Sequence, residues 1–103
     1  MKTVKNQDVE WRDSGVEGIR RGTLWNDGQN VAAELCSMLK DSEYPDHPHR
    51  AWEQMLVLEG SIDVDGVTLA QGDYAFTVPG ESHRVVALSD ALVFLSFGQA
   101  LSG

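Results

Sequence analysis

The stretch His47-Pro48-His49-Arg50-Ala51-Trp52-Glu53 contains two of the three histidines of the chain, followed by a carboxylate four residues after the second. Side chains of an extended strand alternate between two faces, so residues 47, 49 and 53 are expected to point the same way. Two imidazoles at i and i+2 stand about 6.5–7 Å apart at their Cα atoms, which lets both reach one ion. The spacing therefore predicts three metal ligands, His47, His49 and Glu53, on the face of one strand.

A fourth ligand is expected from another strand, because one strand covers only one side of an ion. The remaining histidine, His83, follows the turn signal Pro79-Gly80 and precedes the β-prone residues 85–87. Three neutral imidazoles and one carboxylate suit manganese, iron, cobalt, nickel, copper or zinc. Four protein ligands leave two positions open on an octahedral ion. Open positions favour a reactive or ligand-exchanging site over a closed structural one.

Short β-prone segments between closely spaced turn signals predict an all-β sandwich or barrel, formed as a single domain over residues 1–103. The clearest hairpin covers residues 62–69, with Asp65-Gly66 at its tip and alternating apolar residues on both arms. The segment Val31–Lys40 contains several residues that favour a helix, but the turn signals on both sides predict a strand. The apolar run Ala91–Phe97 is typical of a closing strand buried on both faces.

Composition argues against several classes of partner. Sixteen acidic residues against eight basic ones give a net charge of −8, and such a surface repels nucleic-acid phosphates. No apolar run approaches the roughly 20 residues that cross a bilayer. The N-terminus lacks the apolar stretch of a signal peptide, so a cytoplasmic location without membrane contact is expected. The single cysteine, Cys36, excludes an internal disulfide and is expected to be a small buried apolar residue.

The two histidine segments resemble the two motifs of the cupins, G-x5-H-x-H-x3/4-E-x6-G and G-x5-P-x-G-x2-H-x3-N. The first motif is matched from its first histidine onward by His47, His49, Glu53 and Gly60. The second is matched in spacing by Gly72, Gly80 and His83. The departures from the motifs fall on positions that carry no metal ligand, namely Asp41, Pro79 and Ala87.

This resemblance implies a cupin fold, a double-stranded β-helix or jelly-roll barrel, with one divalent metal ion such as iron, manganese, nickel or zinc. It implies a metal-dependent enzyme acting on a small-molecule substrate, with dioxygenase-like oxidoreductase chemistry as the first expectation and isomerase or lyase chemistry as an alternative. A non-catalytic sensor module is the other alternative. It is suggested by residues 55–61, which are similar to the cupin half of ChrR-type anti-sigma factors.

Four residues are expected to face the cavity beside the metal, because the strands over 31–40 and 91–97 should flank the ligand strands: Glu34, Cys36, Phe94 and Ser96. Glu34 is the candidate catalytic residue, since a carboxylate near an open metal position can act as a general base. The alternative for Glu34 is a solvated strand residue or a salt-bridge partner.

The opposite face of the ligand strand is expected to carry apolar residues that have the other parity: Trp52, Leu56 and Leu58. Small cupins commonly dimerise through the outer face of one sheet. The resemblance therefore implies a homodimer formed through these residues.

Overall fold

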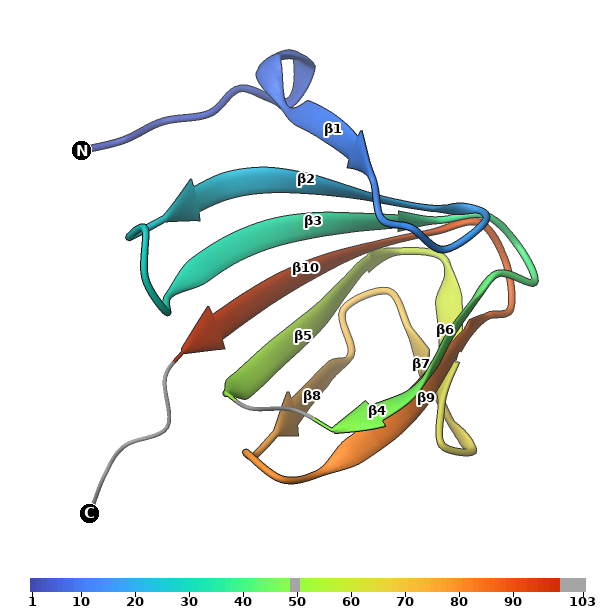
Figure 1. Ribbon diagram of the computed structural model, residues 1–103. Helices are drawn as coiled ribbons and strands as arrows, with labels where there is room; N and C mark the ends of the chain where they lie inside the picture. The colour runs from blue at the N-terminus through green and yellow to red at the C-terminus, as the bar shows by residue number, and fades with distance from the viewer. Residues whose placement is uncertain (49–50, 99–103) are drawn as a thin grey trace.

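The computed structural model describes residues 1–48 and 51–98, with the backbone alone for residues 46–48. This part of the chain consists of ten strands and one short 3-10 helix (Figure 1). The elements are η1 (Asn6–Asp8), β1 (Glu10–Asp13), β2 (Ile19–Asn26), β3 (Ala32–Met38), β4 (Glu43–Pro48), β5 (Trp52–Glu59), β6 (Ser61–Val64), β7 (Val67–Ala70), β8 (Tyr74–Thr77), β9 (Ser82–Ala87) and β10 (Ala91–Gly98). No helix among the described residues has the length and apolarity needed to cross a membrane.

The strands form two antiparallel sheets. The larger sheet has the order β1-β2-β3-β10-β5-β8, and the smaller one has the order β4-β9-β6-β7. Strands that are distant in sequence therefore pair, as where β10 lies between β3 and β5. The two sheets lie against each other (Figure 1), and this arrangement confirms the jelly-roll class expected from the sequence. In the described part of the chain the sheets remain separate hydrogen-bonded units and do not close into a continuous barrel.

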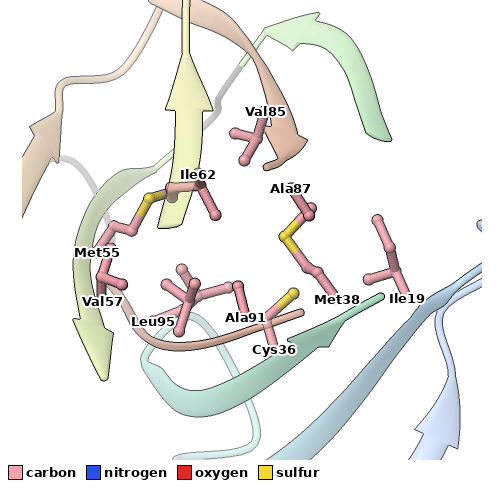
Figure 2. Close-up of a cluster of buried hydrophobic side chains, with 11 residues drawn as sticks. Ile19, Cys36, Met38, Met55, Val57, Ile62, Val85, Ala87, Ala91 and Leu95 are labelled. Carbon is pink, nitrogen blue, oxygen red and sulfur yellow. The ribbon is translucent and has the colours of Figure 1, made fainter. Parts of the chain in front are cut away.

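The apolar core lies between the sheets and is built by strict alternation along the strands. In β5, Glu53, Met55 and Val57 are buried, whereas the even-numbered residues between them are only partly covered. Figure 2 shows how side chains from both sheets converge on this interior. Ile19, Met38 and Ile62 are among the largest side chains that solvent hardly reaches. Burial of apolar surface on this scale is the main force that holds the two sheets together.

The local elements largely follow the sequence. The hairpin of β6 and β7 turns at Asp65 and Gly66, which have φ values of 48° and 88°. A turn with two positive φ angles matches the right-handed twist of the flanking strands. The predicted strand over 31–40 is β3.

The expectation for β10 is only half right. Its odd-numbered residues from Ala91 to Leu95 are buried, but the even-numbered residues Leu92, Phe94 and Ser96 are half-buried. The reason is that the even-numbered side chains point away from the interior and lack a second sheet to cover them within the described residues. In β10, a continuous apolar run therefore forms a strand with one face in the core and the other on the outside of the sheet.

The structure also corrects the idea that one strand carries three of the ligands. Strand β4 ends at Pro48 and β5 begins at Trp52, and these strands belong to different sheets. His47 is thus in the smaller sheet and Glu53 in the larger one. Strand parity therefore cannot place these two residues on one face. The chain instead crosses from one sheet to the other between them.

Candidate metal centre and cavity

Glu53 and His83 meet between the two sheets. Glu53 comes from β5 and His83 from β9, and both are buried. The Nε2 atom of His83 lies 3.8 Å from Oε1 of Glu53. A carboxylate oxygen and an imidazole nitrogen at this separation can bind one metal ion, since each needs to stand only about 2.0–2.2 Å from it.

Thr77 holds the opposite side of the His83 ring. Its Oγ1 atom lies 3.3 Å from Nδ1 of His83, and the hydroxyl is buried with the ring. Thr77 is also the register partner of Glu53 across β5 and β8, so it contacts the histidine from the sheet that carries the carboxylate. When Nδ1 donates its proton to Thr77, Nε2 keeps a lone pair for a metal. No motif or spacing in the sequence singles out this threonine.

The other two predicted ligands lie at or beyond the edge of the described residues. The Cα register pairs His47 of β4 with His83 of β9, so the backbone sets these two positions opposite each other. The side chain of His47 and the whole of His49 lie outside the described residues. Among the side chains that are described, no three histidine, cysteine, aspartate or glutamate residues gather around one point. The four-ligand site therefore stays a prediction, of which the structure describes the Glu53–His83 half.

A cavity of about 120 Å³ extends from these two residues into the core. Most of its wall is apolar and comes from both sheets, including Met38, Met55, Val85, Val93 and Leu95. Its polar lining consists of Glu53 and His83 together with Arg21, Cys36 and Tyr44. A mostly apolar pocket with a few convergent polar groups is the usual form of a small-molecule site.

The burial of Cys36 agrees with the expectation of a small apolar residue. Its side chain lines the cavity with 3% of its surface exposed. Burial raises the pKa of the Cys36 thiol to about 11. The thiol is therefore protonated at neutral pH, and a protonated thiol is a poor nucleophile.

Phe94 and Ser96 do not face the cavity as expected. The cavity is lined by their neighbours Val93, Leu95 and Phe97, and side chains of a strand alternate between its faces. Register confirms this reversal, because Phe94 pairs with Leu56 and Ser96 with Gln54 on the outer face of β5. The continuous apolar run gave no alternation from which the inward parity could be read.

Glu34 is buried, and its carboxylate forms ion pairs with two arginines. Arg12 donates to its Oε2 atom at 2.6 Å, and Nη2 of Arg21 donates to its Oε1 atom. Burial alone would raise the pKa of Glu34, but the hydrogen bond from Arg12 and the charge of Arg21 hold it below the usual value. Glu34 is not among the residues that line the cavity. Its environment is that of the salt-bridge partner that the sequence left as the alternative, while the catalytic role stays untested.

Arg21 is the cavity residue that the sequence did not indicate. It lies on β2 with its side chain 17% exposed, and its guanidinium reaches Glu34 and the hydroxyl of Tyr44. Arg20, its neighbour, is exposed and stacks on Trp11 instead. Only the pairing of β2 with β3 shows which of the two adjacent arginines faces inward. No local signal in the sequence distinguishes them.

Two facing antiparallel sheets, with a buried carboxylate and imidazole above an apolar cavity, are the architecture of a small cupin. The chain belongs to the family described as the ChrR cupin-like domain, whose model matches residues 1–101. A comparison with curated proteins finds no match.

Solved structures support the same fold. An RmlC-like cupin from Shewanella frigidimarina is 28% identical, with a TM-score of 0.82 over 94% of this chain and 89% of that one. ChrR from Rhodobacter sphaeroides, an anti-sigma factor solved in complex with SigE, is also 28% identical, with a TM-score of 0.78. That match covers 90% of this chain but 50% of ChrR. An acetylacetone dioxygenase from Acinetobacter johnsonii is 14% identical with a TM-score of 0.78, a likeness that shows the fold alone.

Proposed function

We propose that the protein binds one divalent metal ion through His47, His49, Glu53 and His83 and presents it to a small organic molecule in the cavity. The observation that supports this most directly is the approach of His83 Nε2 to Glu53 Oε1, 3.8 Å apart and both buried at the cavity wall. A carboxylate oxygen and an imidazole nitrogen that converge at one cavity wall form a mixed donor pair of the kind that divalent transition metals bind.

The residues that the structure describes fit a mixed nitrogen and oxygen site. Glu53 supplies a carboxylate oxygen and His83 an imidazole nitrogen, and Thr77 fixes the orientation of the ring. Such outer hydrogen bonds are typical of histidines that bind metals. A bound metal would supply Lewis-acid or redox chemistry and open positions for a ligand. The protein's own part is to hold the ligand in an apolar cavity and to exclude water from it.

The favoured use of this site is catalysis on a small-molecule substrate, with dioxygenase-like oxidation ahead of isomerase or lyase chemistry. The cavity supports it, because a site that only stabilised the fold would have no need of a ligand-sized space of about 120 Å³ beside Glu53 and His83. The identity of the metal decides between these reactions. Iron or manganese would favour oxidation, whereas zinc or nickel would favour Lewis-acid chemistry.

A sensor module is the second candidate, and the family match favours it. The ChrR cupin-like model covers nearly the whole chain, and the ChrR chain solved with SigE is an anti-sigma factor. In this reading, occupancy of the cavity or of the metal site would change the affinity for a protein partner such as a sigma factor. Both readings require the same metal site and the same cavity.

Metal analysis of protein purified without chelator or nickel resin tests the shared part of the proposal. The expected result is one divalent ion per chain in the unaltered protein and loss of that ion in Glu53→Gln and His83→Ala. Glu59→Gln is the matched control, because Glu59 lies on the same strand but is exposed. Full metal retention in Glu53→Gln and His83→Ala, with folding intact by circular dichroism, would refute the site.

Activity then separates the two candidates. Protein reconstituted with Fe(II) or Mn(II) should consume dioxygen in the presence of an enol, a catechol or a diketone if it is an oxidative enzyme. Absence of turnover across such a panel with every metal, combined with metal-dependent binding to a sigma factor from the same organism, would favour the sensor.

Two further expectations remain proposals of the same kind. The outer face of the larger sheet carries Trp52 stacked on Phe76, with ring centroids 6.3 Å apart. We infer that a second copy of the chain covers this face, as expected for Trp52, Leu56 and Leu58. The exposed aromatic residues Tyr74 and Phe76 beside them support this, because they carry no charge on a protein whose net charge is −8. The cytoplasmic location inferred from the sequence also remains a proposal.

A further inference from the structure

Arg21 places a half-buried positive charge in the wall of a mostly apolar cavity. The side chain is 17% exposed, and it lines the same cavity as Glu53 and His83. A charged group at such a position is costly to desolvate, and replacing a buried ion pair with apolar residues often leaves a protein equally stable or more so. Stability alone therefore does not account for Arg21, and its place in the cavity wall suits contact with a ligand.

The guanidinium is fixed in place from several sides. Its Nη2 donates to Glu34 and its Nη1 donates to the hydroxyl of Tyr44 at 3.3 Å. The guanidinium carbon lies 5.4 Å from the ring centroid of Phe97 and 6.0 Å from that of Tyr44, within the range of cation–π attraction. Phe97 and Tyr44 also line the cavity. An arginine held this way loses little side-chain entropy when it binds an anion.

The charge of Arg21 is only partly neutralised by its neighbours. The single carboxylate of Glu34 is shared between Arg21 and Arg12, so these three side chains together carry one excess positive charge. The Nε atom of Arg21 is buried and makes no hydrogen bond with any residue in the described part of the chain. Because that atom is inaccessible, the donors left for a ligand are on Nη1 and Nη2, which each carry two N–H groups and use one each on Tyr44 and Glu34.

We propose that Arg21 recognises the carboxylate of a small ligand whose short apolar body fills the cavity below Glu53 and His83. This inference deepens the proposed function and rests on it in one respect, that the ligand and the metal share one cavity. A planar carboxylate matches the guanidinium fork, and its single charge suits a wall whose described lining contains one arginine and no lysine. A cavity of about 120 Å³ limits the body of the ligand to about the size of benzene, which an engineered cavity of roughly 150 Å³ holds.

Calorimetric titration with propionate, butyrate and benzoate, each paired with its neutral amide, tests the proposal. At least one carboxylate is expected to bind about tenfold tighter than its amide, a difference of about 1.4 kcal/mol. Arg21→Met should abolish this preference. Arg20→Met is the matched control, because Arg20 is adjacent on β2 but exposed and stacked on Trp11. The control should bind as the unaltered protein does.

Loss of Arg21 leaves the buried Glu34 with Arg12 as its cationic partner and with the Thr23 hydroxyl at 3.5 Å, so Arg21→Met could fail to fold. The double variant Arg21→Met with Glu34→Gln removes both charges and avoids that imbalance. Arg21→Lys keeps the charge but lacks the planar fork, and it should weaken carboxylate binding less than Arg21→Met does. Each variant is checked by circular dichroism before titration, so that only folded protein is compared.

Titrations of metal-free and metal-loaded protein separate this inference from the metal proposal. Carboxylate selectivity that depends on Arg21 in protein that binds no metal would support the inference while the metal proposal fails. If the protein retains its metal but binds carboxylate and amide equally, or binds no carboxylate, the inference is overturned and the metal proposal stands. Selectivity that persists in the folded double variant would also overturn it.

Discussion

His83 Nε2 lies 3.8 Å from Glu53 Oε1, although the two residues belong to strands of different sheets. A metal bound by both would therefore tie the sheets together as well as complete the site. A ligand that binds only the folded state stabilises it by about 2.7 kcal/mol when present at 100 times its dissociation constant.

The first prediction follows from that relationship. Adding the native metal to metal-free protein should raise the melting temperature, by on the order of 10–20 °C for a domain of this size. Differential scanning calorimetry with and without a chelator measures the shift. Glu53→Gln should melt at the same temperature with and without metal, and an equal shift in this variant would contradict a bridge through Glu53.

The second prediction concerns Thr77. Thr77→Val keeps the shape of the side chain but removes the hydroxyl 3.3 Å from His83 Nδ1, so the ring loses its orienting partner. Metal affinity should fall by roughly 10- to 100-fold, as for other outer hydrogen bonds of metal-binding histidines. Competition with a fluorescent chelator measures it. Thr68→Val, at an exposed position of β7, is the control and should change nothing.

The third prediction compares two glycines with a positive φ angle, one in a crowded place and one in open space. Gly60 has a φ of 77°, and a Cβ atom there would lie 2.1 Å from the carbonyl oxygen of Asp90. Gly72 has a φ of 89° but open space around the same position. Urea unfolding should show that Gly72→Ala lowers the free energy of unfolding by about 1–2 kcal/mol. Gly60→Ala should lower it by about 1–3 kcal/mol more than Gly72→Ala does. Equal losses would remove the steric argument.

The fourth prediction is a dependence of stability on pH. The pKa of Glu34 is held below its usual value of 4.5, so its ion pairs stabilise the fold above that pH and are lost as the pH falls below it. Glu34→Gln should lower the free energy of unfolding by on the order of 2 kcal/mol at pH 7. The difference in this free energy between the variant and the unaltered protein should shrink as the pH is lowered.

Urea unfolding at a series of pH values measures this effect. Glu43→Gln serves as the control, because Glu43 also has a lowered pKa, caused by its hydrogen bond to Arg84, but lies in an exposed pair. An exposed ion pair contributes little to stability, so the control should show a small change at every pH. If the difference in unfolding free energy between Glu34→Gln and the unaltered protein stays constant from pH 7 to below 4.5, the ionised Glu34 does not stabilise the fold.

The fifth prediction addresses the outer face. Phe76 is 52% exposed on the edge strand β8, and Phe76→Glu would place a charge where a second copy is proposed to pack. Light scattering should report a dimer for the unaltered protein and a monomer for this variant. Val67→Glu introduces the same charge at a residue 60% exposed on β7 of the other sheet, and should remain dimeric.

The sequence predicted well those features that depend on neighbours along the chain. The Asp65-Gly66 turn fixes its own hairpin, because both residues adopt positive φ angles. Alternation along β5 correctly placed Trp52, Leu56 and Leu58 on the face opposite Glu53, and these three residues are less buried than Glu53. These are short-range properties, and they required no knowledge of which strands pair.

Features that depend on distant contacts could not be read in this way. The crossing from one sheet to the other between His47 and Glu53 leaves no trace in residue parity. The inward position of Arg21, rather than Arg20, follows from the pairing of β2 with β3, which brings Arg21 opposite Cys36. The metal motif was visible because its residue types are distinctive, whereas Thr77 and Arg21 are ordinary residues of a strand until the fold gives them neighbours.

The alternation of side chains has a consequence for how such a domain can diversify. Along β5 and β10, residues that shape the cavity, such as Met55 and Leu95, alternate with outer residues such as Leu56 and Phe94. The interior and the exterior of one strand can therefore mutate separately. A lineage can acquire a new ligand while it keeps its old assembly, or exchange its assembly while it keeps its ligand.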